Sequence, residues 1–182
     1  LVWDVRGHGL SRPYGDRFSI GLATEDLAAI LDQVGAGPVI LVGHSMGGLI
    51  SQEFAFRYPD RVRAMATIGI ACLTCKYGAI TRHVARIPGV FIRFLPEGML
   101  CRLTGWAAGT QRRTRQVARA ASRAVPRADR VRFWREIPRG FHYEPGYRLN
   151  RPLLVTLGPF DVLMGLGGIR GRIRHWARVE PQ

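Results

Sequence analysis

The sequence predicts an α/β fold with a parallel sheet flanked by helices, and three observations support that prediction. First, apolar runs indicate buried strands at residues 38–42, 62–70 and 151–157. Second, an amphipathic segment at residues 20–34 comes shortly before the first of these runs and indicates a helix. Third, a strand that leads through a helix to a second strand forms a βαβ unit, whose two strands are parallel.

The amino-terminal part of the chain is expected to complete the first βαβ unit. Residues 1–5 predict a strand, and residues 6–9 predict the turn that follows it. The helix at residues 20–34 carries its apolar side chains on one face, and Ser19 or Thr24 is expected to cap its start.

The most informative stretch is PVILVGHSMGGLIS at residues 38–51, where a strand runs into a helix through a turn with glycines on both sides of a serine. Such a turn is very sharp and holds Ser45 in a strained conformation above the sheet. Gly43 and Gly47 lack a Cβ, so strand and helix can pass close to each other. At the helix N-terminus, backbone N–H groups and the helix dipole favour a developing negative charge. We therefore predict that Ser45 is a nucleophile and that the Met46 N–H is one oxyanion donor, the alternative being a tight turn with an idle serine.

The motif VGHSMGG at residues 42–48 resembles the nucleophile elbow of the α/β-hydrolase family. Two further stretches match the family, WDVRGHGLS at residues 3–11 and RYPDRVRAMATIG at residues 57–69. The resemblance also covers residues 151–161 but is poor between about residues 72 and 150. The residues that frame the serine in the elbow are Gly43, His44, Gly47 and Gly48. These matches are specific for the fold, and they are weak for the substrate.

The resemblance also implies the position of a catalytic acid. In the family this acid lies in a G-x-x-D turn after a late strand, and residues 158–161 match that turn with Asp161. Asp161 would accept the N–H of a histidine, fix its tautomer and stabilise the imidazolium that forms. The alternative is that Asp161 is a helix N-cap.

A serine hydrolase also needs a base, which in this fold is a histidine that follows the acid on a loop after one more strand. His175 follows Asp161, but it lies in a helical context. His83 and His142 lie in the segment expected to form a cap. His8 precedes the nucleophile and is expected to be a structural turn residue. The second oxyanion donor should come from a loop before the first strand. The sequence therefore looks truncated at both ends, and we expect this chain alone to be nearly inactive and poorly folded.

The chain is expected to divide into three parts: residues 1–72 as the first part of the hydrolase core, residues 73–149 as a helical cap insertion, and residues 150–182 as an incomplete second part of the core. In the cap segment, prolines and glycines separate short stretches without a strand pattern. Six apolar residues of this segment are candidates to line an acyl pocket, or else to pack the cap itself: Phe91, Phe94, Leu95, Leu100, Leu103 and Trp106.

The composition is strongly basic, with a net charge of +14 and Lys76 as the only lysine among 27 basic residues. An arginine recurs every three or four positions at Arg112, Arg115, Arg119 and Arg123. On a helix these residues form one stripe, which is either a solvated face or a docking surface for an anionic substrate, a cofactor phosphate or a membrane. No nucleic-acid-binding motif accompanies the charge, so nucleic acid is not an expected partner.

Cys72 and Cys75 form a lone C-x-x-C, and Cys101 lies far from them in the sequence. We expect buried or idle thiols in a reducing cytoplasm rather than a disulfide, a redox pair or a metal site. No cofactor and no metal are expected. No apolar run approaches the roughly 18 residues of a membrane span. Peripheral membrane contact and the oligomeric state are left open.

Taken together, the sequence favours a cytoplasmic serine hydrolase, esterase-like or lipase-like, that cleaves an ester or related acyl bond of a small-molecule substrate. Thioesters, lactones, C–C bonds and perhydrolysis remain open, because the fold does not set the chemistry. A serine where other branches have an aspartate nucleophile argues against a dehalogenase or an epoxide hydrolase. The alternatives are a degenerate, non-catalytic binding protein that keeps the hydrolase shell and, less favoured, a basic surface module for polyanions.

Overall fold

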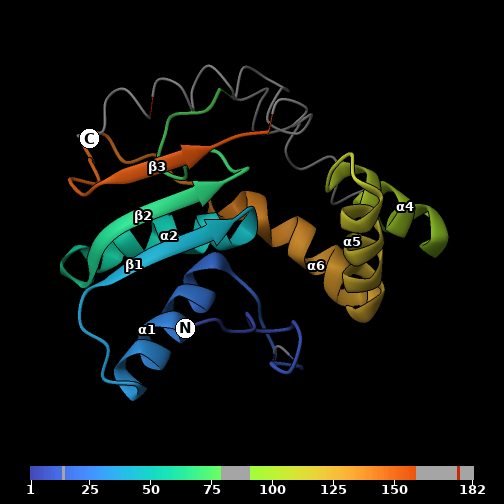
Figure 1. Cartoon of the computed structure of the whole chain (residues 1–182), viewed down its shortest axis with the longest axis horizontal. Helices are drawn as coiled ribbons and strands as arrows, with labels where there is room; N and C mark the ends of the chain where they lie inside the picture. Colours follow the sequence, from blue (N-terminus) through green and yellow to red (C-terminus); the bar gives the residue numbers. More distant parts are fainter. Residues whose placement is uncertain (14, 79–90, 159–175, 177–182) are drawn as a thin grey trace.

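The computed structural model describes residues 1–13, 15–78, 91–158 and 176. Its centre is a parallel sheet with the strand order β1-β2-β3. The strands are β1 (Val39–His44), β2 (Val62–Ile68) and β3 (Leu153–Thr156). All three lie within or next to the predicted runs, and Figure 1 shows them side by side with α2 (Met46–Arg57) against one face. The α/β fold class with a parallel sheet is therefore confirmed.

Ser19 caps helix α1 (Ile20–Gln33), because its hydroxyl accepts a hydrogen bond from the Leu22 N–H at 3.0 Å. Thr24, the other candidate cap, lies inside the helix instead. It is buried, and its hydroxyl donates to the Ile20 carbonyl at 2.9 Å. The prediction that Ser19 caps the helix is thus confirmed. The alternative, Thr24, is wrong because the helix begins about one turn before it.

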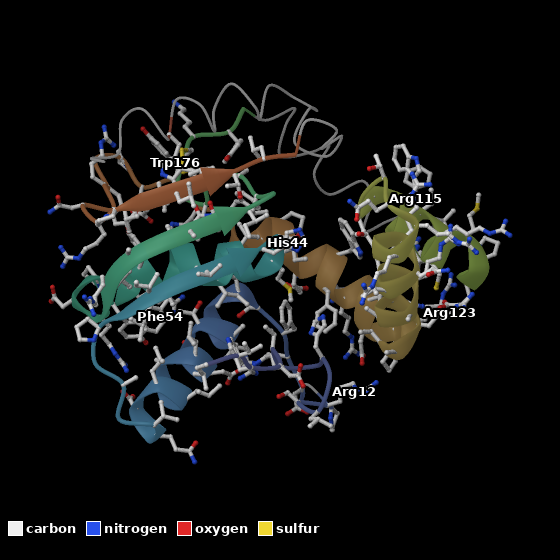
Figure 2. All side chains as sticks on the ribbon, viewed as in Figure 1. Arg12, His44, Phe54, Arg115, Arg123 and Trp176 are labelled. Atoms are coloured by element: carbon white, nitrogen blue, oxygen red, sulfur yellow. A yellow bond between two sulfur atoms is a disulfide. The ribbon has the colours of Figure 1, made fainter. Side chains whose placement is uncertain are left out.

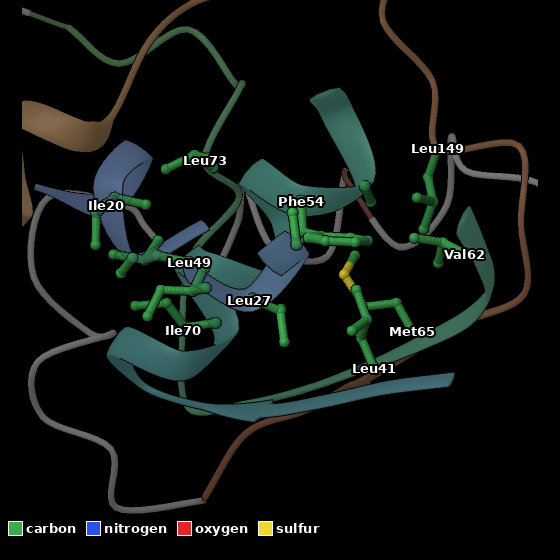
Figure 3. Packing of buried hydrophobic residues seen from close by; sticks show 14 of the residues in the cluster. Ile20, Leu27, Leu41, Leu49, Phe54, Val62, Met65, Ile70, Leu73 and Leu149 are labelled. Atoms are coloured by element: carbon green, nitrogen blue, oxygen red, sulfur yellow. The ribbon is translucent and has the colours of Figure 1, made fainter. Parts of the chain in front are cut away.

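The hydrophobic core lies between α1, α2 and one face of the sheet (Figure 3). Leu49 and Phe54 of α2 are fully buried there, and Leu27, Leu41 and Met65 pack in the same cluster from α1, β1 and β2. Burial of each large apolar side chain contributes about 1.5–3 kcal/mol. This core fixes the position of α2 above the strands.

The opposite face of the sheet is exposed. Ile40, Val42, Ile68 and Leu154 are 63%, 69%, 42% and 60% exposed. Val42 is the parallel partner of Ala66, and Ala66 is the partner of Leu154, so these side chains share one face across the three strands. The apolar runs predicted strands buried on both faces, whereas the described structure buries one face.

Residues 1–5 do not form the predicted strand in the described structure. A strand needs backbone hydrogen bonds to a neighbouring strand, and β1, β2 and β3 pair only with one another. Trp3 and Val5 still pack partly buried against the core, while Leu1 and Val2 are 79% and 97% exposed. The apolar pattern therefore reflects burial of part of the segment without strand pairing.

Three helices follow the segment around Phe91: α4 (Glu97–Ala107), α5 (Arg112–Ala124) and α6 (Arg127–Glu136). Within residues 91–149 the structure describes no strand, as the sequence predicted. In Figure 1, α4 and α5 lie together at the end of the molecule away from the sheet, and α6 leads back toward it.

Arg130 of α6 connects these three helices. It is buried, and its guanidinium donates to the carboxylate of Glu97 on α4 and to the carbonyl of Ser122 on α5. Hydrogen bonding from Arg130 is the largest cause that lowers the pKa of Glu97 from its ordinary value. The carboxylate is 48% exposed, so solvent screens part of this interaction.

Cys72 and Cys75 are joined by a disulfide, which contradicts the expectation of idle thiols. The chain bends directly after β2 and brings the two Cα atoms to 5.6 Å, within the range that a disulfide bridges. Cys101 is a free, buried thiol. The C-x-x-C spacing alone did not show that the bend would bring the two sulfur atoms together.

Glu97→Gln should make the protein less sensitive to acid. Because the pKa of Glu97 is lowered below 4.5 on folding, the folded state binds fewer protons than the unfolded state near that pH. The Glu97–Arg130 pair therefore stabilises the fold above that pH, and its contribution is lost as the pH falls through the lowered pKa. We expect the wild type to lose up to about 1 kcal/mol more than Glu97→Gln between neutral and strongly acidic pH, measured from urea unfolding. If the wild type and Glu97→Gln lost the same free energy of unfolding on acidification, the stabilising role of the Glu97–Arg130 pair would be contradicted.

Candidate active site

Ser45 lies at the junction between β1 and α2, at the position where the sequence predicted a sharp turn. Its backbone has φ 50° and ψ −118°, a left-handed conformation that side chains rarely adopt. Such a residue costs about 1–3 kcal/mol and persists only when its surroundings impose it. The residue is exposed, so its hydroxyl is not covered by packed side chains. The structure therefore shows the strained, accessible serine that the pattern predicts.

Backbone hydrogen bonds on both sides hold this turn in place. The Ser45 N–H donates to the Ile68 carbonyl at the end of β2 at 2.9 Å. The Ser45 carbonyl accepts from the N–H groups of Gly48 and Leu49 at 2.9 Å and 3.3 Å. The first bond anchors the turn to the sheet, and the other two begin helix α2.

The close contact between strand and helix depends on Gly43 and Gly48. A Cβ on Gly43 would lie 2.4 Å from the Gly47 carbonyl oxygen, and one on Gly48 would lie 2.6 Å from Cγ2 of Ile70. A Cβ on Gly47 would have nothing within 4 Å. The prediction that the first glycine allows the close approach agrees with this geometry. The same prediction for Gly47 is wrong, because the neighbouring chain passes Gly48 instead.

Met46 is the first residue of α2, so its N–H belongs to the first helical turn, whose donors have no carbonyl partner within the helix. The helix dipole also favours negative charge at this end. His44 is exposed at the end of β1, opposite Ile68, and is labelled in Figure 2. The roles assigned to Met46 and His44 stay predictions.

Asp161, the predicted acid, lies outside the described residues, as do His83 and His175. His8 stacks on Phe133 with ring centroids 4.6 Å apart, in agreement with a structural part in the loop after residue 5.

His142 is held between two carboxylates. Its Nε2 lies 2.9 Å from Oε2 of the buried Glu53, and its Nδ1 lies 2.9 Å from Oε1 of Glu144. Within the described part of the chain, neither His8 nor His142 is hydrogen-bonded to Ser45.

The side chain of Gln52 stabilises the start of α2 through hydrogen bonds to the backbone. The sequence analysis did not identify this residue. Its side chain is buried and donates to the carbonyls of Gly48 at 3.2 Å and Ala71 at 3.0 Å. Its carbonyl oxygen accepts from the Leu73 N–H at 2.7 Å. Gln52 thus ties the first turns of α2 to the chain after β2. The signal was available, since a polar side chain on the buried side of an apolar helix needs partners.

The candidate acyl-pocket residues differ in their exposure to solvent. Leu100 is buried and Leu95 is half-buried. The other four are exposed by 45% to 68%: Phe91, Phe94, Leu103 and Trp106. These residues were expected either to line an acyl pocket or to pack the cap itself. Leu100 fits the second alternative because it is buried. In the described part of the chain, the six side chains do not surround a common cavity.

The described residues show neither a metal centre nor a membrane helix. No group of three histidine, cysteine, aspartate or glutamate side chains among them is arranged to hold a metal ion. None of the helices in this part of the chain is both long and apolar enough to cross a lipid bilayer.

A family model described as "alpha/beta hydrolase fold" matches residues 1–149. The chain belongs to the α/β-hydrolase family. Among solved structures, a thermophilic esterase from Thermogutta terrifontis with malate bound has a TM-score of 0.73 and 20% identity, over 98% of this chain and 66% of that chain. At this identity the likeness shows the α/β-hydrolase fold, with a parallel sheet and flanking helices.

Curated relatives match short segments of the chain. Lipase LipV of Mycobacterium tuberculosis is 42% identical over 65 residues, which make up 36% of this chain and 24% of the lipase. Bifunctional epoxide hydrolase 2 of Sus scrofa is 31% identical over 70 residues, 37% of this chain and 13% of that protein. The matches thus span a quarter or less of these relatives. Their names cover more than one reaction, so membership of the family leaves the bond that is cleaved open.

Alanine substitutions at Gly43 and Gly47 should differ in their effect on stability. Gly43→Ala places a Cβ against the backbone of Gly47 and should destabilise the protein by about 1–3 kcal/mol. Gly47→Ala adds a Cβ in open space within α2 and should be neutral or stabilising by up to about 1 kcal/mol. Urea unfolding of the two variants measures the difference. A Gly43→Ala variant as stable as Gly47→Ala would show that β1 and α2 are not in close contact at Gly43.

Proposed function

We propose that this protein is a serine hydrolase that cleaves an ester or related acyl bond through an acyl-enzyme. The observation that carries the proposal is Ser45 itself, an exposed serine with φ 50° between a parallel strand and a helix N-terminus. A turn that only connected two elements would not need a strained, non-glycine residue at this position.

In the proposed mechanism, Oγ of Ser45 attacks the acyl carbon while a histidine takes its proton. The Met46 N–H donates to the oxyanion that develops. The histidine returns the proton to the leaving group, and water then hydrolyses the acyl-enzyme. Asp161 orients the histidine, which we assign to a position beyond Gln182, and we assign the second oxyanion donor to a segment before Leu1. Residues 1–182 by themselves would then turn over esters very slowly.

We also propose that residues 73–149 form a cap inserted between a first core segment, residues 1–72, and a second, residues 150–182. Helices α4, α5 and α6 in the crossover between β2 and β3 support this division. A small-molecule acyl substrate would reach Ser45 under such a cap. The serine at the elbow favours ester chemistry over the epoxide chemistry named for one relative.

A cytoplasmic location, as the sequence suggested, is part of the proposal, and the Cys72–Cys75 disulfide is the observation against it. In a reducing cytoplasm such a pair is usually transient. The competing function is a non-catalytic protein that keeps the hydrolase shell.

A fluorophosphonate probe tests the nucleophile directly. The complete protein that contains these 182 residues should be labelled, and Ser45→Ala should abolish labelling because the attacking hydroxyl is removed. Ser51→Ala is the matched control. Ser51 lies in the same helix, is buried and donates to the Gly47 carbonyl at 2.9 Å, so its loss should leave labelling unchanged.

Labelling that survives Ser45→Ala, or a folded complete protein that no acyl probe labels, would favour the non-catalytic alternative. A normal turnover rate on a p-nitrophenyl ester by residues 1–182 alone would show that the base lies within this chain.

A further inference from the structure

A pocket with a volume of about 320 Å³ lies beside helix α5, at the end of the molecule away from the sheet. Its lining comes from the first two turns of α5 and from one residue two positions before the helix: Thr110, Arg112, Arg115, Gln116 and Arg119. Figure 2 labels Arg115 near one end of α5 and Arg123 near the other. Three of the five lining side chains are guanidinium groups, and the other two carry a hydroxyl and an amide.

These arginines have no acidic partner in the described structure. Neither Arg112, Arg115 nor Arg119 forms an ion pair with a described carboxylate, and α5 itself contains no acidic residue. The nearby carboxylate of Glu97 is taken by Arg127 and Arg130. Like charges at a spacing of three or four residues repel one another on a helix. An anion in the pocket would relieve that repulsion.

The side chains of Arg115 and Arg119 are held in place before any ligand arrives. Nε of Arg115 donates to the Gly109 carbonyl at 2.8 Å. Arg119 packs so closely on α4 that a Cβ at Gly105 would lie 2.8 Å from its Nε, so the glycine makes room for the guanidinium. Ordering these side chains in advance lowers the entropy that a ligand must overcome on binding.

Nε of Arg119 is buried and has no hydrogen-bond partner among the described residues. A buried donor without an acceptor is destabilising, and such groups in a native structure call for an explanation. The donor belongs to a side chain that lines the pocket. Nε itself is enclosed against Gly105 of α4, so a ligand in the pocket would meet the other atoms of this side chain.

We propose that the pocket binds a phosphate group, with Arg112, Arg115 and Arg119 as its charged ligands and Thr110 and Gln116 as neutral ones. Guanidinium groups match the oxygens of phosphate in bidentate geometry, and three of them suit a doubly charged group better than a single carboxylate. The phosphate belongs either to a soluble phosphate ester or to a lipid headgroup. The exposed Leu103 and Trp106 of the adjoining α4 leave both sources open. The site involves neither Ser45 nor Asp161, so it stands apart from the proposed hydrolysis.

Calorimetric titration of the complete protein that contains these 182 residues with inorganic pyrophosphate, at physiological salt, tests the proposal. Wild type should bind, and Arg112→Gln should weaken binding about tenfold through loss of a charge-assisted hydrogen bond. Arg113→Gln is the matched control, because Arg113 is exposed on the same helix but does not line the pocket. It removes the same charge and should change the affinity less than about twofold.

Arg119→Gln should weaken binding at least as much as Arg112→Gln. If Arg119→Gln fails to fold, as judged by circular dichroism, Arg112→Gln decides the outcome, since Arg112 is exposed. Equal weakening by Arg112→Gln and Arg113→Gln would reduce the effect to general attraction by a basic surface and overturn the proposal. Absence of pyrophosphate binding to the folded wild type would overturn it as well.

Vesicle sedimentation separates the two sources of phosphate. Retention on vesicles with phosphatidic acid but not on pure phosphatidylcholine, lost in Arg112→Gln and reversed by pyrophosphate, identifies a lipid headgroup. Pyrophosphate binding without retention identifies a soluble phosphate. Either result supports the pocket, and neither depends on labelling of Ser45.

Discussion

The candidate site depends on the close approach of strand β1 to the first turn of helix α2. Gly43 has no side chain to separate them, and the carbonyl of Gly47 lies where a Cβ would be. The chain must therefore reverse its course within one residue, and Ser45 adopts φ 50° to do so. Its N–H is held by the carbonyl of Ile68 on the neighbouring strand. The strain is thus localised at Ser45, which is exposed.

The rest of the fold keeps this turn in place. Leu49 and Phe54 anchor α2 in the core, and Gln52 joins the helix to the chain that follows β2. A site built on a helix and a strand is held more precisely than one built on loops. The arginines of α5 belong to the separate group of helices α4, α5 and α6. Arg130 of α6 links this group through its hydrogen bonds to Glu97 of α4 and Ser122 of α5. The two candidate sites can therefore be altered independently by mutation.

Local patterns predicted most of the fold, because hydrophobic periodicity and caps depend on residues close in sequence. The three strands, the Ser19 cap and the turn at Ser45 all follow from such patterns. Features that depend on distant neighbours were not predicted correctly. Residues 1–5 lack a strand partner, Gly48 rather than Gly47 faces Ile70, and the bend after β2 joins Cys72 to Cys75. The proposed acid, Asp161, lies outside the described residues and stays a prediction.

The uncovered face of the sheet has a consequence for how the isolated polypeptide behaves in solution. Ile40 and Val42 of β1 and Leu154 of β3 present aliphatic side chains to water on the two strands that flank β2, whereas parallel sheets are normally covered on both sides. Contiguous apolar surface of this kind attracts other apolar surfaces. Purified samples should therefore bind fluorescent hydrophobic dyes and adsorb to plastic.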